Sequence, residues 1–329
     1  MHWRVKKVGR NSKRLNSGKT SFLKDKVAIL IGLFVLCAIL SFATDKFLTS
    51  RNLMSLLRQM TSNAFLTLGI MMCIIIGGID ISVGSVFALG GTITAAMIAH
   101  YGMPTPVAII IGLLVGAGCG AFTGFFISVV KVPAFIATMA MLNMARGIAY
   151  LMTNAAPIRV QEDSFINLGT GSLGIIPYPV IYTIVGIVAI WLFLNKTRMG
   201  RYIYAVGGNE EAAKFSGINV RAVKFVVHTL SGFLAAFAGI VMAARMYSGQ
   251  PAVAVGWEMD AVAASALGGV SLMGGSGSVV GAMIGVLIIG VLKNGLNLLG
   301  VNSFWQLIVQ GLVVLAAVSM DMLKKKIDK

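Results

Sequence analysis

Long hydrophobic segments follow one another along most of the chain, separated by short polar stretches. We distinguish ten of them, at residues 27–44, 60–79, 83–99, 106–130, 133–152, 177–194, 222–243, 260–273, 277–292 and 303–320. A helix that crosses a bilayer perpendicular to its plane needs about 20 apolar residues, so the shortest segments fit re-entrant or broken helices. The pattern predicts an all-α integral membrane protein with about 10 transmembrane helices, within a range of 9–11.

The composition supports this class. Hydrophobic residues make up 57% of the chain and charged residues 12%, with a mean hydropathy of +0.88. Soluble domains carry about twice that charged fraction, so an ordinary soluble fold is excluded. The net charge of +16 would suit nucleic acid, but the basic residues flank apolar runs and are not interleaved with aromatic residues on a compact domain. We therefore expect contact with membrane lipid and none with nucleic acid.

The basic residues also predict the topology. Residues 1–26 form a basic tail with nine Lys or Arg, residues 27–322 the membrane domain, and residues 323–329 a basic C-terminus. With ten spans, twenty of the 27 Lys and Arg fall on the side that holds both ends of the chain and the polar loop 195–221. Basic residues gather on the cytoplasmic side of membrane proteins, so both termini and this loop are predicted to be cytoplasmic.

The loop 195–221 is a long polar interruption with the features of a short helix. Asn209 is suited to cap this helix, Glu210 and Glu211 occupy the first turn, where the helix dipole favours acidic residues, and Gly217 fits the position after its end. A helix of about two turns is marginal in water, which indicates packing against the membrane domain and against a partner protein. An ordinary amphipathic connector between two spans is the alternative.

Asp80 is an acidic residue close to the hydrocarbon, in the turn GGIDISVGS at 77–85. Such a residue often lines a polar path or pairs with a neighbour. Alternatively, Asp80 caps the following span by accepting from the backbone N–H of Ser82 or Val83. The two roles are compatible.

Polar residues at membrane depth suggest a path for a polyhydroxylated solute, because amides both donate and accept hydrogen bonds. For each of them, a hydrogen bond between two helices is the alternative. Besides Asp80, the candidates for this translocation path are Asn63, Asn143, Asn294, Asn297, Gln306 and Gln310, with Trp305 close by.

Glycines mark a second turn and two packing faces. The stretch GGVSLMGGSGSVVG at 268–281 is rich in glycine like the stretch at 77–85, which suggests a parallel internal repeat of spans two to five and seven to ten. Glycines also recur every four residues in two segments, where we expect close helix packing: Gly112, Gly116, Gly120 and Gly124, and Gly277, Gly281 and Gly285.

The chain carries no pattern typical of catalysis or cofactor binding. Cys37, Cys73 and Cys119 lie in apolar runs without metal-ligand spacing and are interpreted as packing residues. The three His are far apart in the sequence, and the stretch at 17–20 that ends like a P-loop has Lys13 in place of the first glycine. We therefore predict no metal site, no bound cofactor and no enzymatic activity in this chain.

Three stretches together resemble the membrane permease subunits of bacterial ABC importers for ribose and related monosaccharides. They are GGIDISVGS at 77–85, GRYIYAVGGNEEAAKFSGI at 200–218 and GGVSLMGGSGSVVG at 268–281. The pattern N-x-x-A-A-x-x-S-G-I of the second stretch is carried by Asn209, Ala212, Ala213, Ser216, Gly217 and Ile218.

This resemblance implies a pore made with a second copy of the chain, in the bacterial plasma (inner) membrane. It also implies a tandem ATPase subunit, which binds ATP and Mg on the cytoplasmic side, and an extracytoplasmic sugar-binding protein. The ATPase would dock on the loop at 200–218, where Glu210 and Glu211 would present charge and Ala212, Ala213 and Phe215 would pack. The coupling residues implied are Asn209, Glu210, Glu211, Ala212, Ala213, Ser216 and Gly217.

One part of the wider importer pattern is missing. Glu211 to Gly217 fit its first part, E-A-A-x-x-x-G, but Val227 and then Thr229 and Leu230 stand where Ile and then Leu-Pro are expected. Two alternatives to a monosaccharide importer remain open. One is a permease of the same superfamily for nucleosides, purines, an autoinducer-type furanose or branched-chain amino acids. The other is an ion-coupled secondary carrier, for which Asp80 is the supporting feature.

Overall fold

The computed structural model of the chain describes residues 29–327, without the side chains of residues 317, 318 and 320–327. The basic tail predicted at 1–26 lies outside the described residues. The C-terminal segment 323–329 is described only in its backbone and only as far as Ile327.

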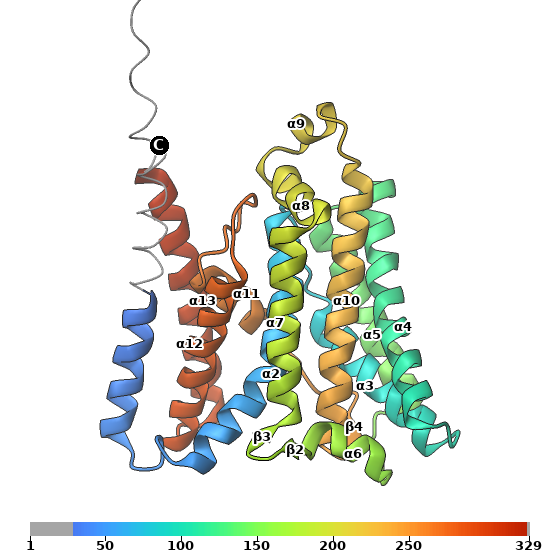
Figure 1. Ribbon diagram of the computed structural model, residues 1–329, viewed down its shortest axis with the longest axis vertical. Helices are drawn as coiled ribbons and strands as arrows, with labels where there is room; N and C mark the ends of the chain where they lie inside the picture. Colours follow the sequence, from blue (N-terminus) through green and yellow to red (C-terminus); the bar gives the residue numbers. More distant parts are fainter. Residues whose placement is uncertain (1–28, 328–329) are drawn as a thin grey trace, which may run out of the picture.

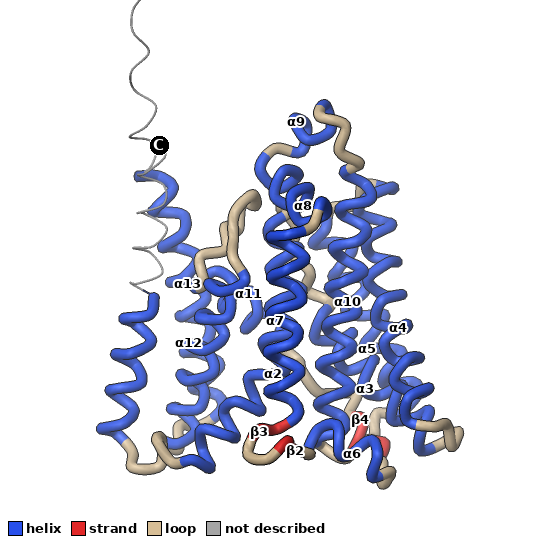
Figure 2. Tube along the Cα trace, in the orientation of Figure 1, coloured by secondary structure: helices blue, strands red, loops and turns tan. Residues whose placement is uncertain are grey.

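Helices make up nearly all of the regular structure (Figures 1 and 2). They are Ile29–Ala43, α2 Ser50–Ile75, α3 Val83–Ala99, α4 Thr105–Phe125, the π-helical turn η1 Phe126–Val130, α5 Ala134–Thr153, α6 Asp163–Thr170, α7 Tyr178–Lys196, α8 Arg198–Gly208, α9 Glu210–Phe215, α10 Val220–Arg245, α11 Trp257–Leu267, α12 Val279–Leu298 and α13 Ser303–Ile327. Two antiparallel pairs of two-residue strands complete the described part: β1 Ile158–Arg159 with β4 Ser248–Gly249, and β2 Ser172–Leu173 with β3 Ile176–Pro177.

Each of the ten hydrophobic segments contains a helix, which agrees with an all-α membrane protein. Within residues 29–327, five helices are long and apolar enough to cross a membrane: Thr105–Val130, Ala134–Thr153, Tyr178–Lys196, Val220–Arg245 and Val279–Leu298. The segment 260–273 holds only α11, whose 11 residues are too few for a span. The predicted number of crossings therefore stays a prediction.

The core lies around α10, which packs on α2, α3 and α4. The glycine stripe of α4 lies in a close helix contact, as predicted, and its main partner is α10: a Cβ on Gly116 would overlap Ala236 of α10. The second stripe also lies in a contact, because a Cβ on Gly285 of α12 would overlap the backbone of Ala264 in α11. Small residues let these helix backbones approach closely, which replaces the hydrophobic driving force that lipid does not supply.

Two long helices are each followed by non-helical backbone and then by a shorter helix. Residues 76–82 separate α2 from α3, and residues 246–256 separate α10 from α11. The two short helices meet at their first turns, where Gly84 lies against Glu258, and the rings of Phe87 and Trp257 are 5.4 Å apart. α3 and α11, the shorter helices that follow the two interruptions, therefore begin at the same level inside the bundle.

α2 and α10 run in opposite directions (Figure 1), so the two broken elements are related in an antiparallel sense. The parallel repeat that we inferred from the sequence would pair these same two helices as spans two and seven, so their opposite directions do not support it, and the repeat stays unconfirmed. The two glycine-rich stretches do lie side by side: a Cβ on Gly274 would lie 3.2 Å from Gly77 N, and Gly275 N donates to the carbonyl oxygen of Ile75, just before the first stretch, at 2.9 Å.

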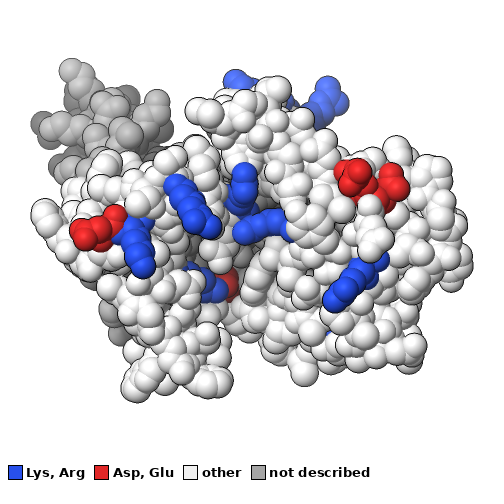
Figure 3. All heavy atoms as spheres, turned by 90° about the horizontal axis from the view of Figure 1, so that it is seen from below, with Lys and Arg blue, Asp and Glu red and all other residues white. Residues whose placement is uncertain are grey.

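The two ends of the bundle differ. α8, α9 and the end of α13 lie at the upper end in Figure 1, and α6 with the strands lies at the lower end. Seen from below, Lys and Arg side chains stand around a hollow in the middle of the lower face (Figure 3).

Candidate coupling and translocation site

The short helix predicted in the loop 195–221 is α9. Asn209 Oδ1 accepts from the backbone N of Ala212 at 2.9 Å, and Glu210 and Glu211 stand in the first turn. Gly217 follows the helix with a φ of +81°, a conformation that side chains with a Cβ rarely adopt. The predicted cap, acidic turn and glycine stop are thus all present.

Some side chains of α9 pack against the rest of the chain, and others are exposed on its surface. Ala213 is buried, whereas Glu211 and Ala212 are exposed and Phe215 is 89% exposed. Lys224 Nζ donates to Glu210 at 2.7 Å, so Glu210 already has a partner within the chain. An exposed pair of this kind contributes at most about 1 kcal/mol, so it does not fix Glu210 in place. Glu211, Ala212, Lys214 and Phe215 are exposed, and Phe215 is the large apolar side chain among them.

The sequence reasoning missed α8, which connects α7 to α9. Thr197 Oγ1 accepts from the backbone N of Gly200 at 3.1 Å and caps α8. Ile203 and Val206 are buried, and Met199 is partly buried. The cap and the apolar spacing i, i+4, i+7 of these three residues were the signals that predict this helix.

Glycine residues lie where α8 meets the end of α2 and the stretch 268–281. A Cβ on Gly207 would overlap the carbonyl oxygen of Ile75 and would lie 2.8 Å from Gly275 N. Tyr204 Oη donates to the carbonyl oxygen of Gly277 at 3.0 Å, and burial raises the pKa of this phenol, so it keeps its proton at neutral pH. α8 therefore packs directly on the end of α2 and on the glycine-rich stretch 268–281.

A hollow of about 880 Å³ lies beneath α9, between the end of α2, the turn after η1 and the start of α10. Several charged side chains line it, namely Lys131, Glu210, Lys214, Arg221 and Lys224. Because this hollow separates much of α9 from the bundle, α9 is joined to the core chiefly through α8 and α10.

Asp80 lies in residues 76–82, between α2 and α3, and is 2% exposed. Its Oδ1 accepts from the backbone N of Ser82 at 3.0 Å and from Ser82 Oγ at 2.6 Å, and its Oδ2 accepts from Ser231 Oγ of α10 at 2.8 Å. The predicted capping bond to Ser82 is therefore present. The carboxylate also ties residues 76–82 to α10.

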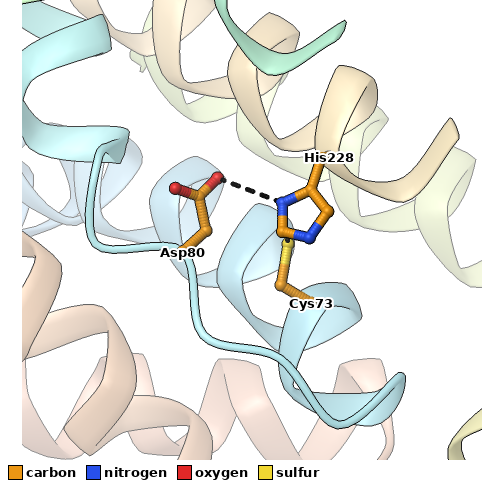
Figure 4. A group of neighbouring side chains, drawn as sticks. All are labelled: Cys73, Asp80 and His228. Atoms are coloured by element: carbon orange, nitrogen blue, oxygen red, sulfur yellow. Dashed lines mark hydrogen bonds and ion pairs between the residues drawn. The ribbon is translucent and has the colours of Figure 1, made fainter. Parts of the chain in front are cut away.

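Cys73, Asp80 and His228 form one buried cluster (Figure 4). His228 Nδ1 lies 3.7 Å from Cys73 Sγ and 4.0 Å from Asp80 Oδ2. These are donor atoms that a transition metal accepts, but both oxygens of Asp80 are already hydrogen-bonded to serines. We interpret the cluster as a polar junction between α2, the broken segment and α10.

The other residues predicted for the translocation path lie in separate contacts, and their role in a path stays a prediction. Asn294 exchanges two hydrogen bonds of 2.9 Å with Asn52, and Gln306 donates to Asn297 at 2.9 Å, so both belong to contacts between polar side chains. Asn143 is exposed on α5, and Asn63 is half-buried on α2. Gln310 is different, because its Nε2 donates to the buried carboxylate of Asp260.

Asp260 and Lys293 are a second set of residues that the sequence reasoning missed. Lys293 of α12 forms an ion pair with Asp260 of α11, which is 2% exposed. Both charges lie within or next to hydrophobic segments, and that placement was the available signal.

Comparisons with known proteins agree with this architecture. Residues 52–318 match the family described as branched-chain amino acid transport system / permease component. The ribose import permease protein RbsC of Escherichia coli K12 is 45% identical over 296 residues, 89% of this chain and 92% of that protein. RbsC of Bacillus subtilis is 44% identical over 90% of this chain and 92% of that protein. The L-arabinose permease AraH of E. coli K12 is 37% identical over 89% of this chain and 88% of that protein.

No solved structure matches the chain. The family match spans most of the sequence, and the similarity to the permeases covers about nine-tenths of it. The chain is therefore a multi-pass protein of the inner membrane and belongs to the family of transport-system permease components.

Proposed function

We propose that this chain is the membrane pore subunit of an ABC importer for ribose. The choice of ribose as the substrate rests on sequence identity. The chain is 44–45% identical to ribose permeases of two bacteria and 37% identical to an arabinose permease, over a similar length of chain. The chain itself does no chemistry. ATP and Mg would bind to a separate ATPase subunit, and a sugar-binding protein outside the membrane would deliver ribose.

The ATPase docks on the loop 195–221, and the free side chains of α9 support this assignment. Phe215 and Glu211 project from a short helix that is anchored at both ends, by the cap at Asn209 and by the turn at Gly217. Force on α9 passes through α8 and Gly207 to the ends of the broken segments. The end of α2 and the stretch 268–281 then move with α8, and the pore switches between outward-open and inward-open states.

The membrane arrangement follows from the same assignment. The end of the bundle that carries α8 and α9 faces the cytoplasm, together with both termini, and the end with α6 faces outward. About ten helices cross or enter the membrane, and two copies of the chain form the pore. The excess of basic residues on the α8–α9 side supports this orientation.

The ion-coupled carrier has less support. Its supporting feature was Asp80, and this carboxylate is occupied by hydrogen bonds from Ser82 and Ser231. The chain also belongs to a permease family. Permeases for nucleosides, an autoinducer-type furanose or branched-chain amino acids stay as substrate alternatives, the last because the family description names such a transport system.

The test is uptake into proteoliposomes that hold this chain with the ATPase encoded beside it, supplied with the neighbouring binding protein. Labelled ribose, arabinose, xylose, galactose, adenosine and leucine are compared. We expect ribose to accumulate only with ATP and the binding protein. Uptake that follows a proton or sodium gradient without ATP would contradict the proposal, and accumulation of another solute would correct its substrate.

A further inference from the structure

The groove beside the start of α11 contains a charged cluster that the coupling site does not use. The groove has a volume of about 570 Å³, within the range of small-molecule sites. It is lined by the first turn of α11 and the two residues before it, by Lys293 of α12 and by one face of α13. Lys293 and Gln310 bind different oxygens of Asp260 within it.

The charges of this cluster indicate what the groove holds. Asp260 is 2% exposed, and Lys293, which lines the groove, is 25% exposed. Charged residues at membrane depth face a bundle interior or a water-filled cavity and mark substrate paths. Met259, Leu307, Val314 and Leu315 add apolar surface to the lining, so the groove sets a charged end at Lys293 beside an apolar wall. A sugar ring, with hydroxyl groups at its edge and C–H groups on its face, matches such a lining.

The backbone before α11 supports the same conclusion. Residues 250–256 are not helical, and Val255 and Gly256 line the groove. Non-helical backbone at membrane depth is tolerated where it is buried in protein or lines a polar cavity. Because α11 begins where it meets the first turn of α3, this part of the groove lies at the level of the two broken helices.

We propose that this groove is part of the sugar path, and that Lys293 and Gln310, both held in place by the buried Asp260, contact the hydroxyl groups of the passing sugar. The proposal rests on the function proposed above and adds the contact residues to it. The ammonium group donates hydrogen bonds and the amide both donates and accepts them, which matches hydroxyl groups that donate and accept. Trp257 lines the same groove and is braced by Phe87, so its indole offers an apolar surface for the C–H face of a sugar ring.

The alternative is a purely structural ion pair that holds α11 against α12. The double variant Asp260→Asn/Lys293→Met separates the two roles, because it removes both charges of the pair and leaves neither without its partner. We expect it to unfold at the wild-type temperature and to keep the ATP hydrolysis that the binding protein stimulates. Its ribose uptake should fall by about tenfold or more, which would be a loss of substrate contacts and not of assembly.

A matched control removes another polar contact between helices. Thr183 Oγ1 of α7 donates to Thr61 Oγ1 of α2 at 3.0 Å, away from the groove. Thr61→Val/Thr183→Val replaces both partners by apolar groups of similar shape, so we expect wild-type uptake.

Wild-type uptake by the Asp260→Asn/Lys293→Met variant would overturn the proposal. If that variant does not assemble, Gln310→Leu carries the test, because it removes an amide and no charge. It should lower uptake several-fold without changing thermal unfolding, and unchanged uptake would again overturn the proposal. A wild-type complex that does not take up ribose would refute the proposed function instead, and the inference with it.

Discussion

Gly207 is the residue at which the coupling loop lies closest to the broken segment. Its Cα stands where the backbones of α8, the end of α2 and the stretch 268–278 meet, and the space admits no side chain. Gly208, one position later, has no atom within 4 Å of the place where a Cβ would stand. An added methyl group would therefore clash with backbone atoms at Gly207 and would meet open space at Gly208.

We expect Gly207→Ala to uncouple transport. The added Cβ has to displace the carbonyl of Ile75 and would disturb the bond that Gly275 N donates to it. Ribose uptake per ATP hydrolysed should fall by about tenfold or more, whereas Gly208→Ala should behave like wild type. The measurement is uptake and ATP hydrolysis in the same proteoliposomes. Equal behaviour of the two variants would argue against the junction as the coupling contact.

Asp80 shows how a residue that stands out in the sequence can have a different main role in the structure. The sequence predicted both a cap and a polar path. The observed bonds to Ser82 and Ser231, with His228 beside them, hold residues 76–82 on α10. The charge that faces a groove is instead Lys293, which is paired with the buried Asp260.

At the scale of elements, the contact of α4 with α10 depends on small residues. Gly116 faces α10, and a Cβ there would overlap Ala236 and lie 2.7 Å from the carbonyl oxygen of Gly232. Gly118 on the same helix is exposed, with nothing within 4 Å of a Cβ. One helix thus offers both a packed and an unpacked glycine within half a turn.

Gly116→Ala is expected to destabilise the bundle by about 1–3 kcal/mol, the usual cost of overpacking. Gly118→Ala should leave stability unchanged or raise it slightly, since Ala is the better helix former. Thermal unfolding of the purified protein in detergent measures both. A lower unfolding temperature for Gly118→Ala than for Gly116→Ala would show that α4 does not pack on α10 through this stripe.

At the scale of the whole molecule, the two ends of the bundle are built for different contacts. One end carries α8 and α9 with the exposed Phe215, and the other carries α6 and the hairpin of β2 and β3 with the exposed Ile175 between them. Their exposed fractions are similar, 89% and 82%. These two positions therefore report the orientation of the protein in the membrane.

Phe215→Cys should react with a membrane-impermeant maleimide only after the cells are opened, and Ile175→Cys should react in intact spheroplasts. The three native cysteines lie in helices, and Cys73 is buried, so the unmodified chain supplies the background. The opposite pattern of labelling would reverse the proposed topology. Labelling of both positions in intact cells would mean that the two loops share one side of the membrane.

The sequence by itself determined the class of the protein and its local features. The ten hydrophobic segments, the cap at Asn209, the stop at Gly217 and the glycine stripe of α4 were predictable, because each depends on spacing and chemistry within a few residues. The family resemblance rested on the same kind of local pattern.

Only the tertiary structure decided which distant residues meet. Asp260 binds Lys293 and Gln310, 33 and 50 positions further along the chain, and Gly207 stands against Ile75 and Gly275. It also decided that α11 is only 11 residues long and begins inside the bundle, at the first turn of α3. The physical reason is that these contacts depend on how the helices cross and how closely their backbones approach, and periodicity along the chain does not specify either.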